Sequence, residues 1–326
     1  MTASEKCWEA QWMVKKQKFY FRSSDKETKI HGICWIPEGK PVKGVLQIAH
    51  GMVEYIDRYD AFARYLCERG FVVVGNDHLG HGDSVKSPDD WGYFGDTKGF
   101  EHVLGDIHKI RRQFRKKYPD VPYFLMGHSM GSFMARAYLM QYGKGISGAI
   151  IMGTGHQPIL AAQAGKLLTN ILSVFKGWHF RSQLVNKMAF GSYNKKFQPS
   201  RTDFDWLTRD EAIVDSYIAE PRCQFVFTLN GYHELFRALI YIEKRKNIEK
   251  LPKDLPVLFV SGDKDPVGNF GKGVDIVCET WEEAGLSDVT LKLFEGGRHE
   301  ILNEIDRNEV YEYLYQWLTD VAGYKA

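Results

Sequence analysis

Residues 122–139 read PYFLMGHSMGSFMARAYL, and they contain the most specific fold signal in the chain. A short apolar run leads into Gly127, then Ser129 stands between Gly127 and Gly131, and residues that favour a helix follow. In a Gly-x-Ser-x-Gly pattern between a strand and a helix, the serine lies on a sharp turn that projects its hydroxyl group, and the glycines keep side chains out of that turn. The pattern alone is common, but this setting predicts that Ser129 is a nucleophile.

The composition is that of an ordinary globular protein, with 326 residues, a net charge of +2, 44% hydrophobic residues and 26% charged residues. A chain of this length can form one large core, or one core with a modest insertion. Its near-neutral charge gives no reason to expect a nucleic-acid partner or a strongly acidic substrate. No stretch approaches the roughly 18 apolar residues of a membrane span, and the first residues lack the apolar block of a signal peptide.

The cysteines are scattered, odd in number and free of Cys-x-x-Cys spacing. This distribution predicts reduced thiols in a cytoplasmic protein, with neither a disulfide framework nor a zinc site. The five are Cys7, Cys34, Cys67, Cys223 and Cys278.

Short apolar runs alternate along the chain with amphipathic helical patterns. Two β-rich stretches come first, at 15–23 and 29–37. We then expect buried strands at 43–50, 71–77, 122–127, 146–153, 256–263 and 289–297. We expect helices near 59–66, 103–114, from 129 onward, 272–285 and 310–321. This alternation predicts an α/β fold with a mostly parallel central sheet that is flanked by helices.

The alternation breaks at residues 154–230, which lack strand-like runs. We therefore expect a core formed by residues 1–153 and 231–326, with residues 154–230 inserted as a helical cap. The long apolar pattern ILAAQAGKLLTNILSVF opens this cap, and its Leu168 and Leu172 share one helical face. We expect the helix to bury one face on the core, and to use further apolar surface to line an acyl pocket or contact a lipid aggregate.

A nucleophilic serine on such an elbow needs a histidine base and an acid, in the chain order serine, acid, histidine. His299 is the single histidine that follows the SGDKD loop, and it comes after an expected strand. The acid is Asp263 or Asp265. Asp263 directly follows Gly262 and suits a turn-capping role, so we favour Asp265 as the residue that orients His299.

An oxyanion hole needs two backbone N–H donors. One is expected from Met130, the residue after the nucleophile. The loop after the expected strand 43–50 should supply the other, where Gly51 lets the backbone approach the substrate and the Met52 amide becomes the donor. His50 is then structural.

The stretch DHLGHGDS at 77–84 raises the question of a metal site, because His78, His81 and Asp83 are close in sequence. A third or fourth ligand of the kind that zinc needs is not evident. We therefore expect no metal here, and interpret the stretch as a glycine-rich turn that shapes the rim of the pocket.

Taken together, the motifs HGMVEYIDRY, DHLGHGDS, GHSMG, SGDKDPV and EGGRHE, in this order, resemble the monoacylglycerol lipase and lysophospholipase branch of the α/β-hydrolases. The resemblance covers roughly residues 28–153 and 231–322. It implies the α/β-hydrolase fold, a triad of Ser129, Asp265 and His299, and an oxyanion hole formed by the amides of Met52 and Met130.

The resemblance also implies a supporting role for Glu54, Arg58 and Tyr59. The chain departs from the family at Ser132, where relatives commonly have a further glycine. The cap cannot be matched to the family, in which it sets substrate choice.

The sequence thus predicts a serine hydrolase that cleaves carboxylic esters of lipid-like alcohols through an acyl-enzyme, without a cofactor. Its partners would be a small lipid-like ester and, through the cap, a lipid surface. A proline-iminopeptidase-like aminopeptidase remains an alternative, with Glu211, Asp215 and Glu220 as candidates to bind the substrate's amino group. A non-catalytic protein that only binds a ligand is a further alternative.

Overall fold

The computed structural model describes residues 14–324, so Cys7 and the expectation of no signal peptide lie outside the described residues. Its centre is an eight-stranded sheet with the strand order β1-β2-β4-β3-β5-β6-β7-β8. The strands are β1 (Val14–Arg22), β2 (Lys29–Pro37), β3 (Gly44–Ala49), β4 (Phe71–Asn76), β5 (Tyr123–His128), β6 (Gly148–Met152), β7 (Val257–Gly262) and β8 (Val289–Phe294). Each strand expected from the sequence is present.

The sheet is mostly parallel. Only the pairs β1–β2 and β2–β4 are antiparallel, and the other neighbours run in the same direction. Every residue of the central strands β3 to β7 is buried, whereas β8 is half-buried because it forms an edge of the sheet. The carboxyl ends of the parallel strands therefore meet at one edge, where sites collect in open α/β sheets.

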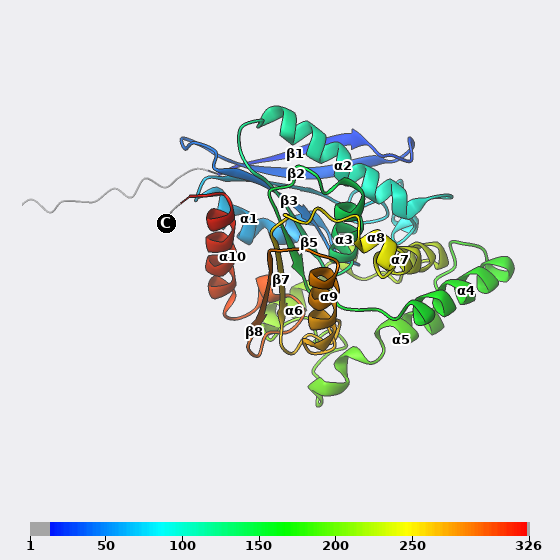
Figure 1. Ribbon diagram of the computed structural model, residues 1–326. Helices are drawn as coiled ribbons and strands as arrows, with labels where there is room; N and C mark the ends of the chain where they lie inside the picture. Colours follow the sequence, from blue (N-terminus) through cyan, green and yellow to red (C-terminus); the bar gives the residue numbers. More distant parts are fainter. Residues whose placement is uncertain (1–13, 325–326) are drawn as a thin grey trace, which may run out of the picture.

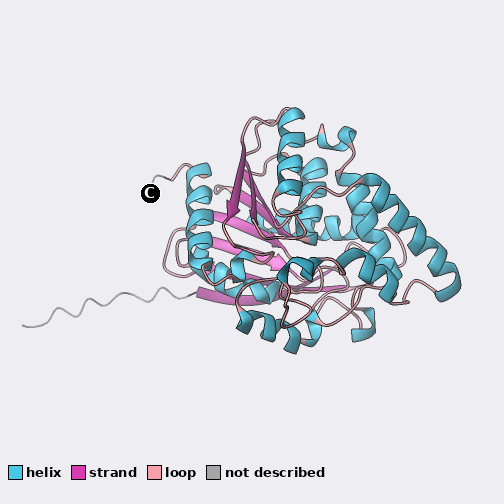
Figure 2. Cartoon of the chain, turned by 90° about the horizontal axis from the view of Figure 1, so that it is seen from below, coloured by secondary structure: helices cyan, strands magenta, loops and turns pink. Residues whose placement is uncertain are grey.

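Helices cover both faces of this sheet (Figures 1 and 2). Neighbouring residues of one strand point to opposite faces, so Leu125 and Met126 of β5 belong to two different core clusters. One cluster includes α1 (Asp60–Cys67) and α10 (Arg307–Val321). The other includes α2 (Gly99–Lys117), α3 (Met130–Tyr142), α7 (Leu229–Ile242) and α9 (Lys272–Glu283). The predicted fold class is confirmed.

The chain between β6 and β7 contains helices and irregular loops but no strand. It forms α4 (Ile159–Lys176), α5 (Gln183–Phe190), α6 (Glu211–Ala219), α7, the short α8 (Arg245–Ile248), and 3-10 turns that include η3 (Tyr193–Phe197) and η4 (Pro221–Cys223). In Figure 1, α4 and α5 project away from the sheet at one end of the molecule. The division into a core and a cap at 154–230 stays a prediction. No helix within residues 14–324 is both long and apolar enough to cross a membrane.

Candidate active site

Ser129 lies on the sharp turn between β5 and α3. Its backbone has φ 54° and ψ −123°, a left-handed conformation that a residue with a side chain adopts only at an energetic cost. The two flanking positions require glycine, because a side chain at either one would clash with the backbone. A Cβ atom on Gly127 would lie 2.2 Å from the carbonyl oxygen of Gly131, and one on Gly131 would lie 2.0 Å from that of Ala49. The serine side chain is thus held on a strained elbow at the carboxyl edge of the sheet.

Ser132, where the chain departs from its family, fits into the first turn of α3. It is completely buried, and its hydroxyl group donates a hydrogen bond to the Ser129 carbonyl oxygen at 2.6 Å. The extra side chain therefore satisfies its own polar group within the turn and leaves the elbow intact.

Asp265 and His299 are in direct contact. The Nδ1 atom of His299 lies 2.9 Å from Oδ2 of Asp265. Asp265 is completely buried, and its carboxylate also accepts hydrogen bonds from the Ser261 hydroxyl at 3.0 Å and from the Val267 amide at 2.9 Å. This fixed carboxylate orients the imidazole and leaves Nε2 as the ring nitrogen that is available for proton transfer.

Asp263 does not contact the imidazole. Its Oδ1 atom accepts a hydrogen bond from the Gly296 amide at 2.7 Å, and Oδ2 pairs with Lys264 at 3.0 Å. Asp263 therefore stabilises the loop that leads to His299, whereas Asp265 contacts the imidazole ring itself.

The end of β6 lies between the serine and the histidine. The amide of Ser129 donates to the Met152 carbonyl oxygen at 3.0 Å, while a Cβ atom on the next residue, Gly153, would lie 3.2 Å from Cε1 of His299. Ser129, Asp265 and His299 follow three parallel strands, β5, β7 and β8, at the same edge of the sheet. The topology thus places Ser129, Asp265 and His299 on the same side of the sheet, although Ser129 and His299 are 170 positions apart in the sequence.

The two expected oxyanion donors lie beside the elbow. Met130 is the first residue of α3, so its amide has no acceptor within the helix. Met52 lies in the turn after β3, next to Gly51, whose Cβ atom would be 3.1 Å from Cβ of Ser129. Val53 has φ 55°, and the Tyr217 hydroxyl holds its carbonyl oxygen at 3.1 Å. A strained and tethered turn therefore presents this backbone to the serine.

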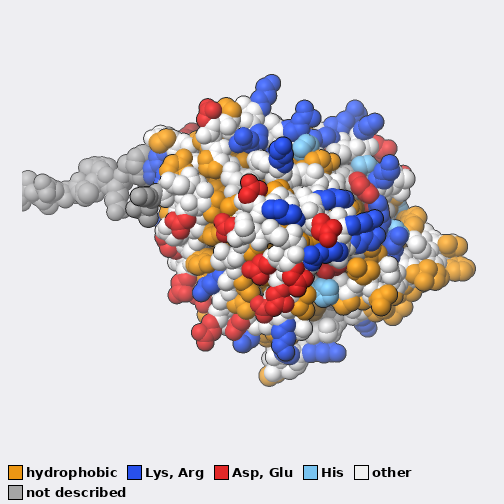
Figure 3. Space-filling view, viewed as in Figure 1, with side chains coloured by type: hydrophobic (Ala, Val, Ile, Leu, Met, Phe, Trp, Pro, Cys, Tyr) orange, Lys and Arg blue, Asp and Glu red, His pale blue; other side chains and the backbone are white. Residues whose placement is uncertain are grey.

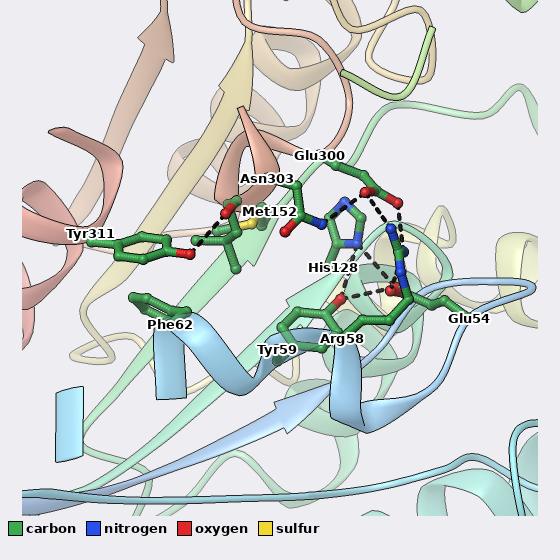
Figure 4. Close-up of a pocket in the computed structure, with 10 residues that line it drawn as sticks. Glu54, Arg58, Tyr59, Phe62, His128, Met152, Glu300, Asn303 and Tyr311 are labelled. Atoms are coloured by element: carbon green, nitrogen blue, oxygen red, sulfur yellow. Dashed lines mark hydrogen bonds and ion pairs between the residues drawn. The ribbon is translucent and has the colours of Figure 1, made fainter. Parts of the chain in front are cut away.

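A buried network of charged groups joins the turn after β3 to the loop that contains His299 (Figure 4). The Arg58 guanidinium binds the Glu300 carboxylate through two hydrogen bonds of 2.7 Å, and it contacts Glu54 at 2.9 Å. Glu54 also accepts hydrogen bonds from the Gly51 amide and, at 2.9 Å, from the Tyr59 hydroxyl. The three residues that resemble the family pattern thus hold the turn that contains Met52.

His128 is the fourth member of this network. Its Nδ1 atom lies 3.2 Å from Oε1 of Glu54, and its Nε2 atom lies 3.2 Å from the backbone carbonyl oxygen of His299. Burial lowers the pKa of His128, but the hydrogen bond to Glu54 and the charges of Glu54 and Glu300 outweigh it, so the pKa is raised. For Glu54, burial is outweighed by the hydrogen bond from His128 and the charge of Arg58, and the pKa is lowered.

A small cavity of about 10 Å³ is lined by the residues of this network, which Figure 4 shows as sticks. Besides the charged groups, it is lined by the apolar side chains of Phe62, Met152 and Leu302. Its volume is about that of one water molecule, so it is too small for an acyl chain.

His50 is a structural residue. Its Nδ1 atom donates to the Gly51 carbonyl oxygen at 2.8 Å, and its Nε2 atom accepts from the His78 amide at 2.8 Å. Its ring packs at a tilted angle against the ring of His78, with centroids 4.2 Å apart, and burial lowers the pKa of His78 to about 4. These neutral rings join the turn after β3 to the glycine-rich turn after β4.

Among the described residues, the group of side chains that could hold a metal ion differs from the set of His78, His81 and Asp83 that the sequence brought into question. His31, Asp77 and Asp83 have donor atoms within 4.8 Å of one another. The Asp77 carboxylate, however, is already bonded to the His31 ring at 2.8 Å and to the amides of Ile56 and Asp83 at 2.8 Å. These contacts fix the turn between β4 and the following loop.

Sequence reasoning missed the contact between His299 and the segment before α6. The Trp206 ring lies 5.0 Å from the His299 ring, centroid to centroid, and the amide of Glu300 donates to the Leu207 carbonyl oxygen at 2.7 Å. Trp206 in turn contacts Tyr193, with ring centroids 4.9 Å apart. Nothing in the spacing of these aromatic residues distinguishes them from core residues, so no local pattern indicates this contact.

Known proteins match the chain over most of its length. Residues 40–306 match the Hydrolase_4 family, described as serine aminopeptidase, S33. Monoglyceride lipase of Mus musculus is 28% identical over 295 residues, which cover 87% of this chain and 85% of that protein. Monoacylglycerol lipase of Mycolicibacterium smegmatis is 27% identical over 301 residues, or 87% of this chain and 90% of that protein.

The structure of a thermostable carboxyl esterase from Bacillus coagulans in complex with glycerol superposes with a TM-score of 0.87 at 31% identity, covering 95% of this chain and 100% of that one. The family match spans well over half of the chain and agrees with the resemblance that the motifs predict. The chain therefore belongs to the Hydrolase_4, serine aminopeptidase S33, family of α/β-hydrolases.

Proposed function

We propose that the protein is a serine hydrolase that cleaves carboxylic esters of lipid-like substrates, such as monoacylglycerols or lysophospholipids. The observation that carries the proposal is the 2.9 Å contact between His299 Nδ1 and Asp265 Oδ2 beside a serine on a strained elbow. The lipase names of the relatives and the carboxyl esterase with bound glycerol support the ester and its glycerol-like alcohol.

In the proposed reaction, the Ser129 hydroxyl oxygen attacks the ester carbonyl carbon while Nε2 of His299 takes the hydroxyl proton. The amides of Met52 and Met130 donate to the oxyanion that forms. Collapse of this intermediate breaks the bond to the alcohol, which leaves with the proton from His299. A water molecule, deprotonated by His299, then hydrolyses the acyl-enzyme and releases the acid.

Half-buried apolar side chains support a lipid acyl group as the acid part of the substrate. Met52 of the oxyanion turn, Trp206, and Leu168 and Leu172 of α4 are each only partly buried against the same large core cluster. We propose that they receive the acyl chain and that the exposed face of α4 touches the lipid surface.

The aminopeptidase alternative requires free carboxylates to bind an ammonium group, and the three candidates are paired with arginines. Asp215 and Glu211 lie 2.6 and 3.9 Å from Arg201, and Glu220 lies 2.8 Å from Arg222. The hydrogen bond from Arg222 lowers the pKa of Glu220 to about 2. These pairs neutralise the charge that an amino group would need, which favours an ester substrate.

A fluorophosphonate probe tests the proposal, because it reacts covalently only with an activated serine. We expect stoichiometric labelling of the purified protein and none of Ser129→Ala. A panel of monoacylglycerols, lysophospholipids, p-nitrophenyl esters and N-terminal proline amides then defines the substrate. If the probe does not label the protein, the hydrolase proposal is wrong and a non-catalytic ligand-binding protein is indicated. Faster turnover of the amides than of every ester would indicate an aminopeptidase. The cytoplasmic location stays a prediction, and it is supported by the four cysteines within residues 14–324, which are buried free thiols.

A further inference from the structure

The two halves of the segment between β6 and α7 meet the rest of the molecule in different ways. Helices α4 and α5 each bury few side chains, and hydrophobic side chains gather on the surface over α4 (Figure 3). Residues 204–224 instead pack inward, in a cluster that the partly buried Tyr55 joins. The buried members of this cluster are Leu207, Tyr217 and Cys223. Because Tyr55 belongs to the loop after β3, the second half of the segment contacts the loop that supplies the proposed oxyanion donor.

Tyr217 of α6 contacts this loop through its hydroxyl group. The hydroxyl donates a hydrogen bond to the Val53 carbonyl oxygen at 3.1 Å, and the residue is only 7% exposed. The Arg58 guanidinium lies over the Tyr217 ring, with its Cζ atom 4.9 Å from the ring centroid. The Tyr217 carbonyl oxygen accepts a hydrogen bond from the side-chain amide of Gln224 at 2.9 Å. Both the ring and the backbone of Tyr217 are therefore fixed where the hydroxyl reaches the turn.

The same segment also holds the chain just after the turn. The Tyr55 hydroxyl donates to the Glu220 carboxylate at 3.2 Å, and the Arg222 guanidinium lies 3.8 Å from the centroid of the Tyr55 ring. Arg222 and Glu220 bind each other at 2.8 Å. The end of α6 and the η4 turn thus anchor the chain on the carboxyl side of the turn.

The turn needs such anchors because its backbone is strained. Val53 has φ 55°, and a β-branched residue adopts this left-handed conformation only where the surrounding structure enforces it. On the amino side, the Gly51 amide donates to the Glu54 carboxylate. On the carboxyl side, Tyr217 holds the Val53 carbonyl oxygen. The Met52 amide lies between these two fixed points, so its direction depends on both of them.

We propose that Tyr217 is a positioning residue for the oxyanion hole. Its hydroxyl group keeps Val53 in the left-handed conformation, which directs the Met52 amide at the oxygen that becomes charged during the reaction. The inference rests on the proposed hydrolase function and adds a residue outside the triad and the two donors. It also divides residues 154–230 by role, because residues 204–224 then support the reacting groups, whereas α4 and α5 are left to the substrate.

Tyr217→Phe tests the inference, since it removes the hydroxyl group and keeps the ring. Loss of a whole oxyanion donor costs about 10²–10³ in kcat, and a displaced donor costs less, so we expect a fall of about 10–100-fold. The KM for a soluble p-nitrophenyl ester should stay within about twofold, because the interaction forms in the transition state. The Ki of a trifluoromethyl ketone should rise by the same factor as kcat falls, since its adduct with Ser129 carries an oxyanion. A purely structural role would lower Tm and leave this Ki unchanged.

A double-mutant cycle with Val53→Asn tests the route by which the hydroxyl acts. Asparagine adopts the left-handed conformation more readily than valine does, so the turn then depends less on its tether. In the Val53→Asn background, Tyr217→Phe should therefore lower kcat by less than about threefold. An equal loss in the two backgrounds would contradict the proposed role.

Tyr123→Phe is the matched control. Its buried hydroxyl donates to the Gln47 side chain at 2.7 Å, at the end of β5 that is far from Ser129. It should lower Tm about as much as Tyr217→Phe and leave kcat and the Ki unchanged. A kcat for Tyr217→Phe within about twofold of the active unmodified protein, a change in KM alone, or an equal loss in the control would overturn the inference. Ester turnover by the unmodified protein tests the hydrolase function, so the two proposals fail in different measurements.

Discussion

The Nε2 atom of His128 lies 3.2 Å from the backbone carbonyl oxygen of His299, so the residue before the proposed nucleophile supports the proposed base. Its other ring nitrogen faces the ionised Glu54 carboxylate, and the Tyr59 hydroxyl proton is already directed to that carboxylate. Neither the Glu54 carboxylate nor the His299 carbonyl oxygen has a proton that it could donate to the ring. His128 therefore carries a proton on each nitrogen, and its positive charge with that of Arg58 balances the two buried carboxylates of Glu54 and Glu300.

The stability of the protein should consequently depend on pH through this network. Because the pKa of His128 is raised above its ordinary value of 6.5, the stability that it contributes is fully present below pH 6.5 and is lost as the pH rises through the raised value. The pKa values of Glu54 and Glu300 are lowered, so their contribution is present above pH 4.5 and is lost as the pH falls through the lowered values. Thermal melting across pH 4–9 should show the highest Tm between these limits.

His128→Gln provides the decisive comparison. Below pH 6 it should cost about 3–5 kcal/mol of unfolding free energy, since it leaves the buried carboxylates short of one positive charge. It should also remove most of the decline in stability above pH 6.5. His179→Gln, at an exposed site, is the control and should retain the decline. An unchanged alkaline decline in His128→Gln would show that another group titrates.

Ser129→Ala should reduce ester turnover by at least about 10⁴-fold with an unchanged Tm, because it removes the attacking oxygen. His299→Ala should have a similar effect, and the double variant should be little worse than either, since the two residues act as one unit. Steady-state hydrolysis of a p-nitrophenyl ester measures this. Turnover at the wild-type rate by Ser129→Ala, in preparations free of other esterases, would disprove the mechanism.

Substitutions of Asp265 and Asp263 should have clearly different effects on kcat. Asp265→Asn should lower kcat on the order of 10⁴-fold, because the amide no longer selects the productive tautomer of His299. Asp263→Asn keeps an oxygen that can accept from the Gly296 amide and should cost less than about tenfold. Comparison of kcat for the two variants is the measurement, and the reverse ranking would make Asp263 the acid.

Leu168 and Leu172 lie on the half-buried side of α4, and they distinguish acyl recognition from simple packing. Replacing both by serine should lower kcat/KM for long-chain monoacylglycerols and largely spare an acetyl ester, because the reacting groups lie outside α4. A parallel fall for both substrates with a lower Tm would indicate a purely structural helix. The exposed pair Leu167→Ser and Val174→Ser should leave the soluble acetyl ester unaffected.

Much of the fold, and the contact between His299 and Asp265, could be predicted because each relies on local chemistry. The elbow requires Gly127 and Gly131, the sheet alternates with its helices, and the order of serine, acid and histidine follows from the strand order. Glu300 was not singled out, although it follows His299 directly, because its role depends on Arg58, 242 residues away. Which face of α4 is exposed also depends on tertiary packing, because its buried residues are Ala162, Gly165 and Thr169. Their small size was the only signal of this in the sequence.

The proposed contact of α4 with a lipid surface, through its exposed Leu160, Leu167, Ile171, Val174 and Phe175, has a kinetic consequence. An enzyme held on a bilayer through this helix meets its substrate in two dimensions, by lateral diffusion, and not from bulk solution. Its velocity should then follow the mole fraction of ester within the membrane. Diluting the substrate with inert phospholipid at constant bulk concentration should slow hydrolysis, whereas adding more vesicles of the same composition should not accelerate it once all the protein is bound.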